Sequence, residues 1–257
     1  MGVQWGRMVT DLSQVEQAAS DGFDFVQPVT DLLADLDDEQ VLRQQARIHD
    51  GGLPFKVCAV PLPADVRVTQ KGFNIYVWME HLKNAVSRTA ELGCRKLIWS
   101  DGRARVLPVE GATAGFKEQV LQFLYMLCGV ATDFDMAVLV EPLGPRRTNF
   151  LNTMKETGDF LARVGAENLS SLISLRELEK VGLSPTDLSD YRQLIGHVQM
   201  DNPGSYEGAR ICPRPQDGYE YGPVLQALRD AGYSADISLP DDADAEGLAY
   251  CRGLWEE

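Results

Sequence analysis

Short apolar segments alternate with helical patterns along the whole chain, and this alternation constrains the fold more than any other feature. Each apolar segment is as short and as uniformly apolar as a strand that is buried on both faces. Strands that alternate with helices indicate a parallel sheet, because each helix returns the chain to the start of the next strand. The predicted strands are residues 3–5, 23–27, 56–60, 96–99, 137–141, 169–173, 196–200 and 235–239.

Helical patterns fill the intervals between these strands. Two helix starts have the sequence of a capping box, Ser13 with Glu16 and Thr153 with Glu156. A third start has a proline, Pro185, in its first turn. The predicted helices are residues 12–19, 38–49, 74–92, 116–131, 153–164, 176–181, a segment that starts at 184, 221–231 and 245–254.

Eight strand–helix units in 257 residues, about 32 residues each, predict a (β/α)8 TIM barrel that forms one domain over residues 1–257. A doubly wound open sheet is the alternative. No G-x-G-x-x-G follows the first predicted strand and no G-x-x-x-x-G-K-[ST] occurs, so the nucleotide-binding forms of that fold lack their signature. No linker rich in proline, glycine or serine divides the chain.

The charge and cysteine patterns limit the partners and the compartment. The chain has 24 Lys and Arg against 38 Asp and Glu, a net charge of −14, so we expect no nucleic-acid partner. No apolar run reaches the ~18 residues of a membrane span and no signal-peptide pattern is visible, so we expect no membrane partner. Five scattered cysteines without metal-ligand spacing indicate reduced thiols and a cytoplasmic location.

Glu141 is the strongest candidate for a catalytic or metal-binding residue. It ends an apolar predicted strand and precedes a proline. The active site of a TIM barrel lies at the carboxyl ends of the strands, and a charge buried there is costly unless it is paired or ligated. Glu141 is therefore predicted to be a metal ligand or a general base. The alternative is a structural carboxylate bonded to the backbone or to an arginine.

Arginines and tryptophans provide the second set of candidates. Arginine suits the bidentate binding of carboxylate or phosphate, so arginines in the loops after strands four, five and seven indicate a local anion site. The alternative is ordinary solvated charge or salt bridges to the surplus acids. Trp5 and Trp99 lie at strand ends and are predicted to pack on a sugar ring. The loop arginines are Arg103, Arg105, Arg146, Arg147, Arg210 and Arg214.

One segment resembles a known family. The residues from Glu141 to Thr153, EPLGPRRTNFLNT, are very similar to the EPL…TNFLNT segment of the sugar phosphate isomerase/epimerase family. These proteins are xylose-isomerase-like TIM barrels that include ketose 3-epimerases. Weaker similarities cover most of the rest of the chain, at residues 22–26, 101–108, 196–199, 218–228 and 232–233.

The resemblance implies a divalent ion, Mn²⁺ or Mg²⁺, that is held by four ligands. Only Glu141 stands at its expected place. The family's D-x-x-H pattern after strand six falls on Ser174 and Glu177, its strand-seven histidine falls on Gln199, and its last glutamate falls near Pro240. Hydroxyl and amide groups are poor substitutes for charged ligands of a hard ion. We therefore expect a degenerate metal site and no cofactor. A relocated site for Mn or Mg would have to combine Glu141 with Glu177, Asp201 and Asp236.

The remaining site assignments follow from this comparison. Ser174 and Glu177 are expected to form a capping box, although Glu177 is also a catalytic candidate at the family's histidine position. His197, on the seventh strand, is either a catalytic residue or a satisfied core residue. Arg210 best matches the family's substrate-binding arginine after strand seven. The predicted catalytic residues are Glu141, Glu177 and His197, and the predicted substrate-binding residues are Trp5, Trp99, Arg103, Arg105, Gln199, Asp201 and Arg210.

The predicted function is that of a sugar isomerase- or epimerase-like protein. It would bind a small polyhydroxylated or anionic ligand, a sugar or sugar acid, at the carboxyl end of the barrel. If it is catalytic, Glu141 is the base for proton transfer next to a carbonyl. The alternatives are a non-catalytic ligand-binding protein or partner subunit, and a metal-independent lyase or hydrolase. The resemblance also implies a homodimer or homotetramer.

Overall fold

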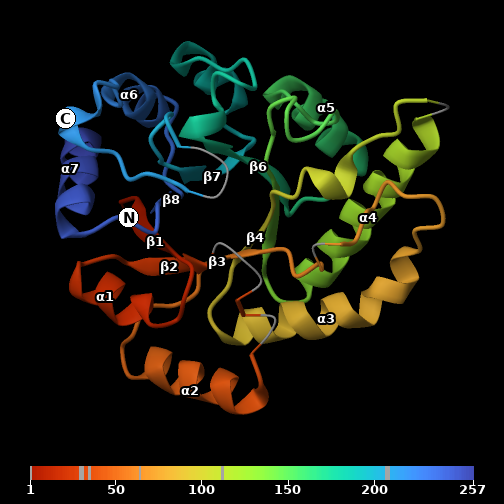
Figure 1. Cartoon of the computed structure of the whole chain (residues 1–257), viewed down its shortest axis with the longest axis horizontal. Helices are drawn as coiled ribbons and strands as arrows, with labels where there is room; N and C mark the ends of the chain where they lie inside the picture. Colours follow the sequence, from red (N-terminus) through yellow and green to blue (C-terminus); the bar gives the residue numbers. More distant parts are fainter. Residues whose placement is uncertain (1, 29–31, 34–35, 64, 111–112, 206–208) are drawn as a thin grey trace.

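Parallel strands form the inner wall of the protein in a computed structural model that describes residues 2–28, 32–33, 36–63, 65–110, 113–205 and 209–257 (Figure 1). In this part of the chain the strands follow one another in the order β2-β1-β8-β7-β6-β5-β4-β3. The two outer members, β2 and β3, contact each other, and Val26 N donates to the Pro54 carbonyl at 3.0 Å. The wall therefore closes into the predicted barrel. The strands are β1 (Gln4–Val9), β2 (Phe25–Pro28), β3 (Val57–Ala59), β4 (Lys96–Trp99), β5 (Ala137–Val140), β6 (Leu169–Ser174), β7 (Ile195–Gln199) and β8 (Asp236–Leu239).

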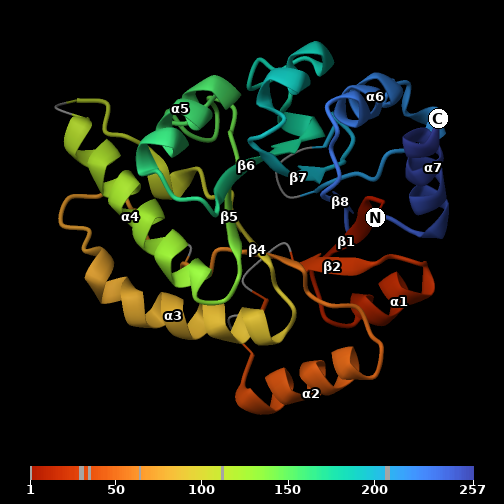
Figure 2. The same ribbon diagram turned by 180° about the vertical axis from the view of Figure 1, so that it is seen from behind.

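Helices surround this wall, and both views show α3 and α4 side by side along one flank (Figures 1 and 2). Among the helices that the structure describes, none combines the length and the hydropathy that a membrane span requires. The α-helices are α1 (Gln14–Ser20), α2 (Asp38–His49), α3 (Ile75–Glu91), α4 (Ala114–Thr132), α5 (Met154–Val164), α6 (Gly222–Asp230) and α7 (Ala245–Glu256). The short 3-10 helices are η1 (Arg103–Arg105), η2 (Leu175–Glu177), η3 (Pro185–Tyr191) and η4 (Pro215–Asp217).

The connection from β6 to β7 differs from the prediction. The expected helix over 176–181 is only the 3-10 turn η2 followed by a hydrogen-bonded turn. Gly182 then adopts φ +67°, a left-handed conformation that ends a helical turn. The following segment, η3, starts at Pro185, one residue after the predicted start at 184, and it is a 3-10 helix.

The predicted caps are correct at some helix starts and wrong at others. Thr153 accepts from Glu156 N at 3.0 Å, although the Glu156 carboxylate accepts from Asn152 N and not from the cap residue. Ser13 makes no side-chain cap. The Gln14 side chain accepts from Thr10 N at 2.7 Å instead. The backbone before α1 is therefore held by a glutamine of the helix and not by the predicted cap residue.

The apolar core has two parts because alternate residues of each strand face opposite sides of the wall. One cluster lines the barrel interior, and the larger cluster lies between the strands and the helices. Gly6 belongs to the inner face, where a Cβ would lie 2.2 Å from the Phe25 ring. The interior cluster is formed by Phe25, Val57, Ile98, Leu139 and Leu172.

Charged side chains close the amino end of the barrel below this cluster. Asp236, the first residue of β8, accepts from Lys56 Nζ and from Lys96 Nζ, each at 2.6 Å. Lys96 also donates to the Gly196 carbonyl at 2.9 Å. The ion triad occupies the end of the barrel that is opposite to Glu141, so the polar groups of the carboxyl end form a separate set.

Candidate functional site

Buried polar side chains gather where β5, β6 and β7 end. Glu141 follows β5, Ser174 ends β6, Gln199 ends β7, and Asp201 lies two residues further on. All four are buried, with exposed fractions of 2% or less. Because side chains two apart on a strand point to the same side, these residues continue the inward-facing rows of Leu139, Leu172 and His197. The barrel interior therefore becomes polar at its carboxyl end.

Glu141 is held by its backbone and not by its carboxylate. Its N–H donates to the Trp99 carbonyl at 3.2 Å, and its own carbonyl accepts from Arg105 Nη2. Neither carboxylate oxygen has a hydrogen-bond partner among the described residues. A structural carboxylate would be bonded to the backbone or to an arginine, and this one is bonded to neither. The buried oxygens are thus left without a hydrogen-bond partner by the described residues.

Arg105 lies fully buried beside this carboxylate. Its guanidinium stacks on the Trp99 ring, 5.4 Å from the centroid. Burial lowers the pKa of Arg105 to about 10, while the charge of Glu141 acts in the opposite direction. Its Nε and Nη1 atoms have no partner in the part of the chain that the structure describes. Arg105 therefore fixes the Glu141 backbone and places a positive charge near the carboxylate without forming an ion pair with it.

Asp201 organises a second group of charges. It accepts from Arg210 Nη1 at 2.5 Å, from Ser174 Oγ at 3.1 Å and from Arg176 N at 3.1 Å. The Arg176 Nε lies 3.5 Å from Asp201 Oδ2. Burial and then the charge of Arg210 lower the pKa of Arg176, and Glu141 and Asp201 oppose this effect. Two arginines from different connections thus meet at one buried carboxylate.

Glu177 does not cap a helix with Ser174, so the predicted capping box is wrong. Its Oε2 accepts from Gly144 N at 3.1 Å, and its Oε1 lies 3.3 Å from Lys180 Nζ. Ser174 Oγ turns toward Asp201 instead of the following backbone. Glu177 therefore ties the loop after β5, which starts with Glu141, to the turn after β6. This carboxylate is engaged, in contrast to that of Glu141.

His197 lies one inward-facing position below Gln199 and is completely buried. Its Nε2 is 3.2 Å from the Gln27 side-chain oxygen, which implies that Nε2 carries the proton and donates. Burial, and secondly the charge of Lys96, lower the pKa of His197 to about 3. The imidazole is therefore neutral at physiological pH, and it hydrogen-bonds within the barrel interior.

The other predicted contacts are distributed differently. Trp5 and Trp99 both lie in the outer core between strands and helices, and Trp99 packs on Phe123 with centroids 5.1 Å apart. Arg103 is exposed on η1 and lies 3.8 Å from Asp101. The structure brings together Glu141, Arg105, Gln199, Asp201 and Arg210, but it does not bring Trp5 or Arg103 to them.

Two side chains that the sequence pattern did not single out also lie at the carboxyl end of the barrel. Arg176 stands between the two positions that were compared with the family pattern, and Ser238 lies on β8 opposite Gln199. The Ser238 hydroxyl and the Gln199 side-chain oxygen are buried and have no partner in the described ranges. The inward alternation of β7 and β8 was the signal that could have identified Ser238.

The donors at this end do not fit a divalent ion. Within the described residues, no three His, Cys, Asp or Glu side chains lie close enough together to hold a metal. Asp201 is occupied by Arg210 and Ser174, and Asp236 lies at the amino end with two lysines. The alternative of a relocated site that includes Asp236 is therefore wrong. Arg210 and Arg176 approach Asp201, one of the few anionic donors that a hard cation would need at this end.

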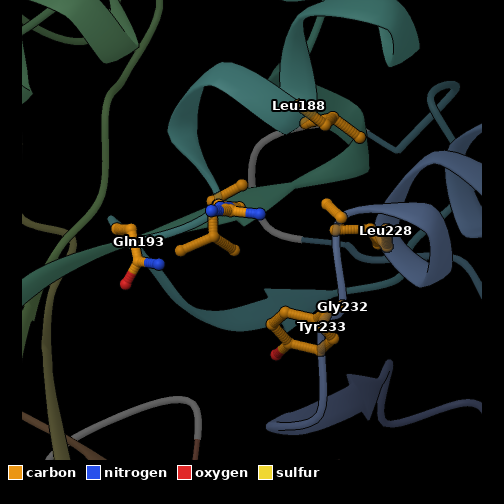
Figure 3. A pocket seen from close by; sticks show the side chains of 8 residues that line it. Leu188, Gln193, Leu228, Gly232 and Tyr233 are labelled. Carbon is orange, nitrogen blue, oxygen red and sulfur yellow. The ribbon is translucent and has the colours of Figure 1, made fainter.

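A pocket of about 340 Å³ lies elsewhere, beside the start of β7 (Figure 3). Leu188 from η3 and Leu228 from α6 form its walls, and Tyr233 lies below them in this view. Ile195 and Tyr233 place it toward the amino ends of β7 and β8. It contains none of the predicted site residues and none of the buried polar atoms without partners, so the chemistry of the protein is better sought at the carboxyl end.

Comparisons with known proteins agree with this architecture. Residues 15–247 match the family model described as xylose isomerase-like TIM barrel, and no curated protein sequence matches the chain. A D-psicose 3-epimerase crystallised in the presence of D-fructose superposes with a TM-score of 0.82 at 14% identity, over 99% of this chain and 100% of that one. D-Psicose 3-epimerase from Clostridium cellulolyticum H10 with D-tagatose gives 0.81 at 14% identity, over 98% and 99%. The 3-keto-D-glucoside 4-epimerase YcjR from E. coli gives 0.76 at 17% identity, over 98% and 99%. At such identities the likeness shows the fold alone.

Proposed function

Because the chain belongs to the xylose isomerase-like TIM barrel family, we propose that it binds a small polyhydroxylated ligand at the carboxyl end of the barrel. We further propose that Glu141 transfers a proton next to a carbonyl group of that ligand. The observation that carries the proposal is the Glu141 carboxylate, which is buried and has both oxygens free among the described residues. Structural neighbours of this fold include epimerases crystallised with ketoses.

The surroundings of Glu141 suit a base. Its charge is balanced by Arg105 and Arg176, which influence it without occupying its oxygens. Ligand hydroxyl groups would donate to these oxygens and to the free side-chain oxygens of Gln199 and Ser238. A guanidinium N–H would donate to the carbonyl oxygen on which negative charge develops, as Arg105 Nη1 and Nε have no other partner in the described chain.

The same geometry favours proton transfer on one face of the ligand. Inversion of a stereocentre needs a second group that delivers the proton from the opposite face. The other carboxylates at this end, Glu177 and Asp201, are hydrogen-bonded to protein groups, and His197 is bonded to Gln27. A single free carboxylate serves an aldose–ketose type of interconversion, in which one base removes a proton from carbon and delivers a proton to the adjacent carbon, while the hydroxyl proton passes to the former carbonyl oxygen.

Isotope exchange tests this proposal. The metal-stripped protein is incubated in D₂O with D-fructose, D-tagatose and D-psicose, and proton NMR follows the loss of the C–H signals next to the carbonyl. We expect exchange that is abolished by Glu141→Gln, an isosteric change that removes the base. Glu118→Gln, at an exposed position on α4, is the matched control and should exchange like the parent protein.

Ligand binding without turnover is the second candidate function, and the engagement of Glu177 and Asp201 favours it. Calorimetric binding of a ketose with no exchange would support this second function. Exchange that persists in Glu141→Gln would refute the role of Glu141 as the base.

A further inference from the structure

Arg176 and Arg210 approach the same buried carboxylate from two connections of the barrel. Arg176 belongs to η2 after β6, and Arg210 lies in the loop after β7. Arg210 Nη1 donates to Asp201 Oδ2 at 2.5 Å and to Ser174 Oγ at 3.2 Å. Arg176 Nε lies 3.5 Å from the same Asp201 oxygen. Two guanidinium groups therefore share one carboxylate.

This pairing leaves hydrogen-bond donors of the two arginines unused. Asp201 balances one of the two arginines, and Glu177, 3.9 Å from Arg176 Nε, also serves Lys180 and Gly144. Arg176 is only 9% exposed, and its Nε is buried without a hydrogen-bond partner in the described residues. This Nε lies between Asp201 and Glu177 without an aligned hydrogen bond, and a buried donor on a charged group is costly when it is unsatisfied. An acceptor on a ligand would relieve this cost at the guanidinium.

We infer that Arg176 and Arg210 form a subsite for a small oxyanion, a carboxylate or a phosphate, carried by the polyhydroxylated ligand. The inference rests on the proposed function, which places the ligand next to Glu141. It narrows the substrate class to sugar acids or sugar phosphates. The planar forks of two guanidinium groups match the paired oxygens of either anion. The chain as a whole has a net charge of −14, so such a subsite depends on this local pair.

Asp201 acts as the positioning residue of this subsite. It is fully buried, and it also accepts from Ser174 Oγ and Arg176 N, so its orientation is fixed by the backbone and by β6. The carboxylate holds both arginines in place before a ligand arrives and reduces the repulsion between them. It leaves the remaining N–H groups of both side chains for the ligand.

Three probes with the same carbon chain test the inference. Sorbitol is neutral, D-gluconate carries a carboxylate, and sorbitol 6-phosphate carries a phosphate. Calorimetric titration of the metal-stripped protein should show at least about tenfold tighter binding of one or both anions than of sorbitol, the effect of about one lost charged hydrogen bond. The tighter of the two anions identifies the oxyanion.

Variants of the pair locate the effect. Arg210→Gln should remove the preference for the anions, and Arg210→Lys, which keeps the charge and thus the fold, should weaken it because the fork is lost. Arg43→Gln, on the exposed face of α2, removes one positive charge far from the barrel end and should leave the preference unchanged. If Arg210→Gln does not fold, the anion preference of Arg210→Lys tests the subsite on its own.

Equal binding of the three probes would overturn the inference and leave the proposed function intact, provided that Glu141→Gln still abolishes proton exchange. A preference for anions that survives in both Arg210 variants would place the oxyanion elsewhere and would also overturn it. Absence of binding by all three probes, with ketose exchange present, would again refute the anion subsite alone. Absence of both binding and exchange would refute the proposed function as well.

Discussion

The buried imidazole of His197 makes the protein sensitive to acid in a way that can be calculated. Burial and the nearby charges of Lys96, Lys56 and Arg210 lower its pKa from 6.5 to about 3, and only Asp236 opposes them. The unfolded chain takes up a proton at this histidine below about pH 6.5, whereas the folded chain does not do so until about pH 3. The contribution of His197 to stability is therefore complete above pH 6.5 and is lost progressively as the pH falls toward 3.

The size of this effect follows from the width of the pH window. Each pH unit inside the window costs about 1.4 kcal/mol, so the loss between pH 7 and pH 5 is about 2 kcal/mol. For a chain of this size it corresponds to roughly 4–8 °C in Tm. His197→Gln cannot gain the proton and still offers a donor to Gln27, so its stability should fall by about 2 kcal/mol less over the same interval.

Urea unfolding at the two pH values measures this difference. Only His197 is removed in the variant, so the difference between the pH responses of the parent protein and the variant isolates the contribution of His197. His49→Gln, at an exposed position on α2, is the matched control variant and is measured at the same two pH values. An equal pH response of the parent and His197→Gln would refute the placement of a neutral, buried His197.

Other perturbations address the barrel itself. Asp236→Asn leaves Lys56 and Lys96 together without their anion, so we expect a loss of about 3–5 kcal/mol in the free energy of unfolding by urea. Lys56→Met, which leaves the Asp236–Lys96 pair intact, should cost less, and the opposite ranking would contradict the role of Asp236 as the shared anion. Gly6→Ala places a methyl group 2.2 Å from the Phe25 ring, so we expect about 1–3 kcal/mol of destabilisation by thermal unfolding. An unchanged Tm would contradict the close contact between Gly6 and the Phe25 ring.

The barrel could be predicted from the sequence because its signal is distributed over the whole chain. Segments such as 96–99 and 38–49 have the same bounds in the structure as in the prediction. Local exceptions arose where tertiary contacts overrode local sequence. The Ser174 hydroxyl turned to Asp201 and the Glu177 carboxylate turned to Gly144, two partners that are far away in sequence and that no local pattern contains.

The site could be predicted only in part for the same reason. The position of Glu141 at the end of an apolar strand was enough to place it at the carboxyl end of the barrel. The sequence could not show that its oxygens are free, because that depends on where Arg105 directs its single hydrogen bond. Nor could it show that Arg176 and Arg210 converge, since they are 34 positions apart and meet only through Asp201.

Our central proposal is that this barrel binds its ligand through arginines and one free carboxylate instead of a divalent ion. The most direct test is the calorimetric affinity of the metal-stripped protein for the tighter-binding of D-gluconate and sorbitol 6-phosphate, measured in EDTA and again with Mn²⁺ at millimolar concentration. The account predicts that the affinity is the same in both conditions and that Arg210→Gln abolishes binding. Binding that appears only when Mn²⁺ is added would contradict the account.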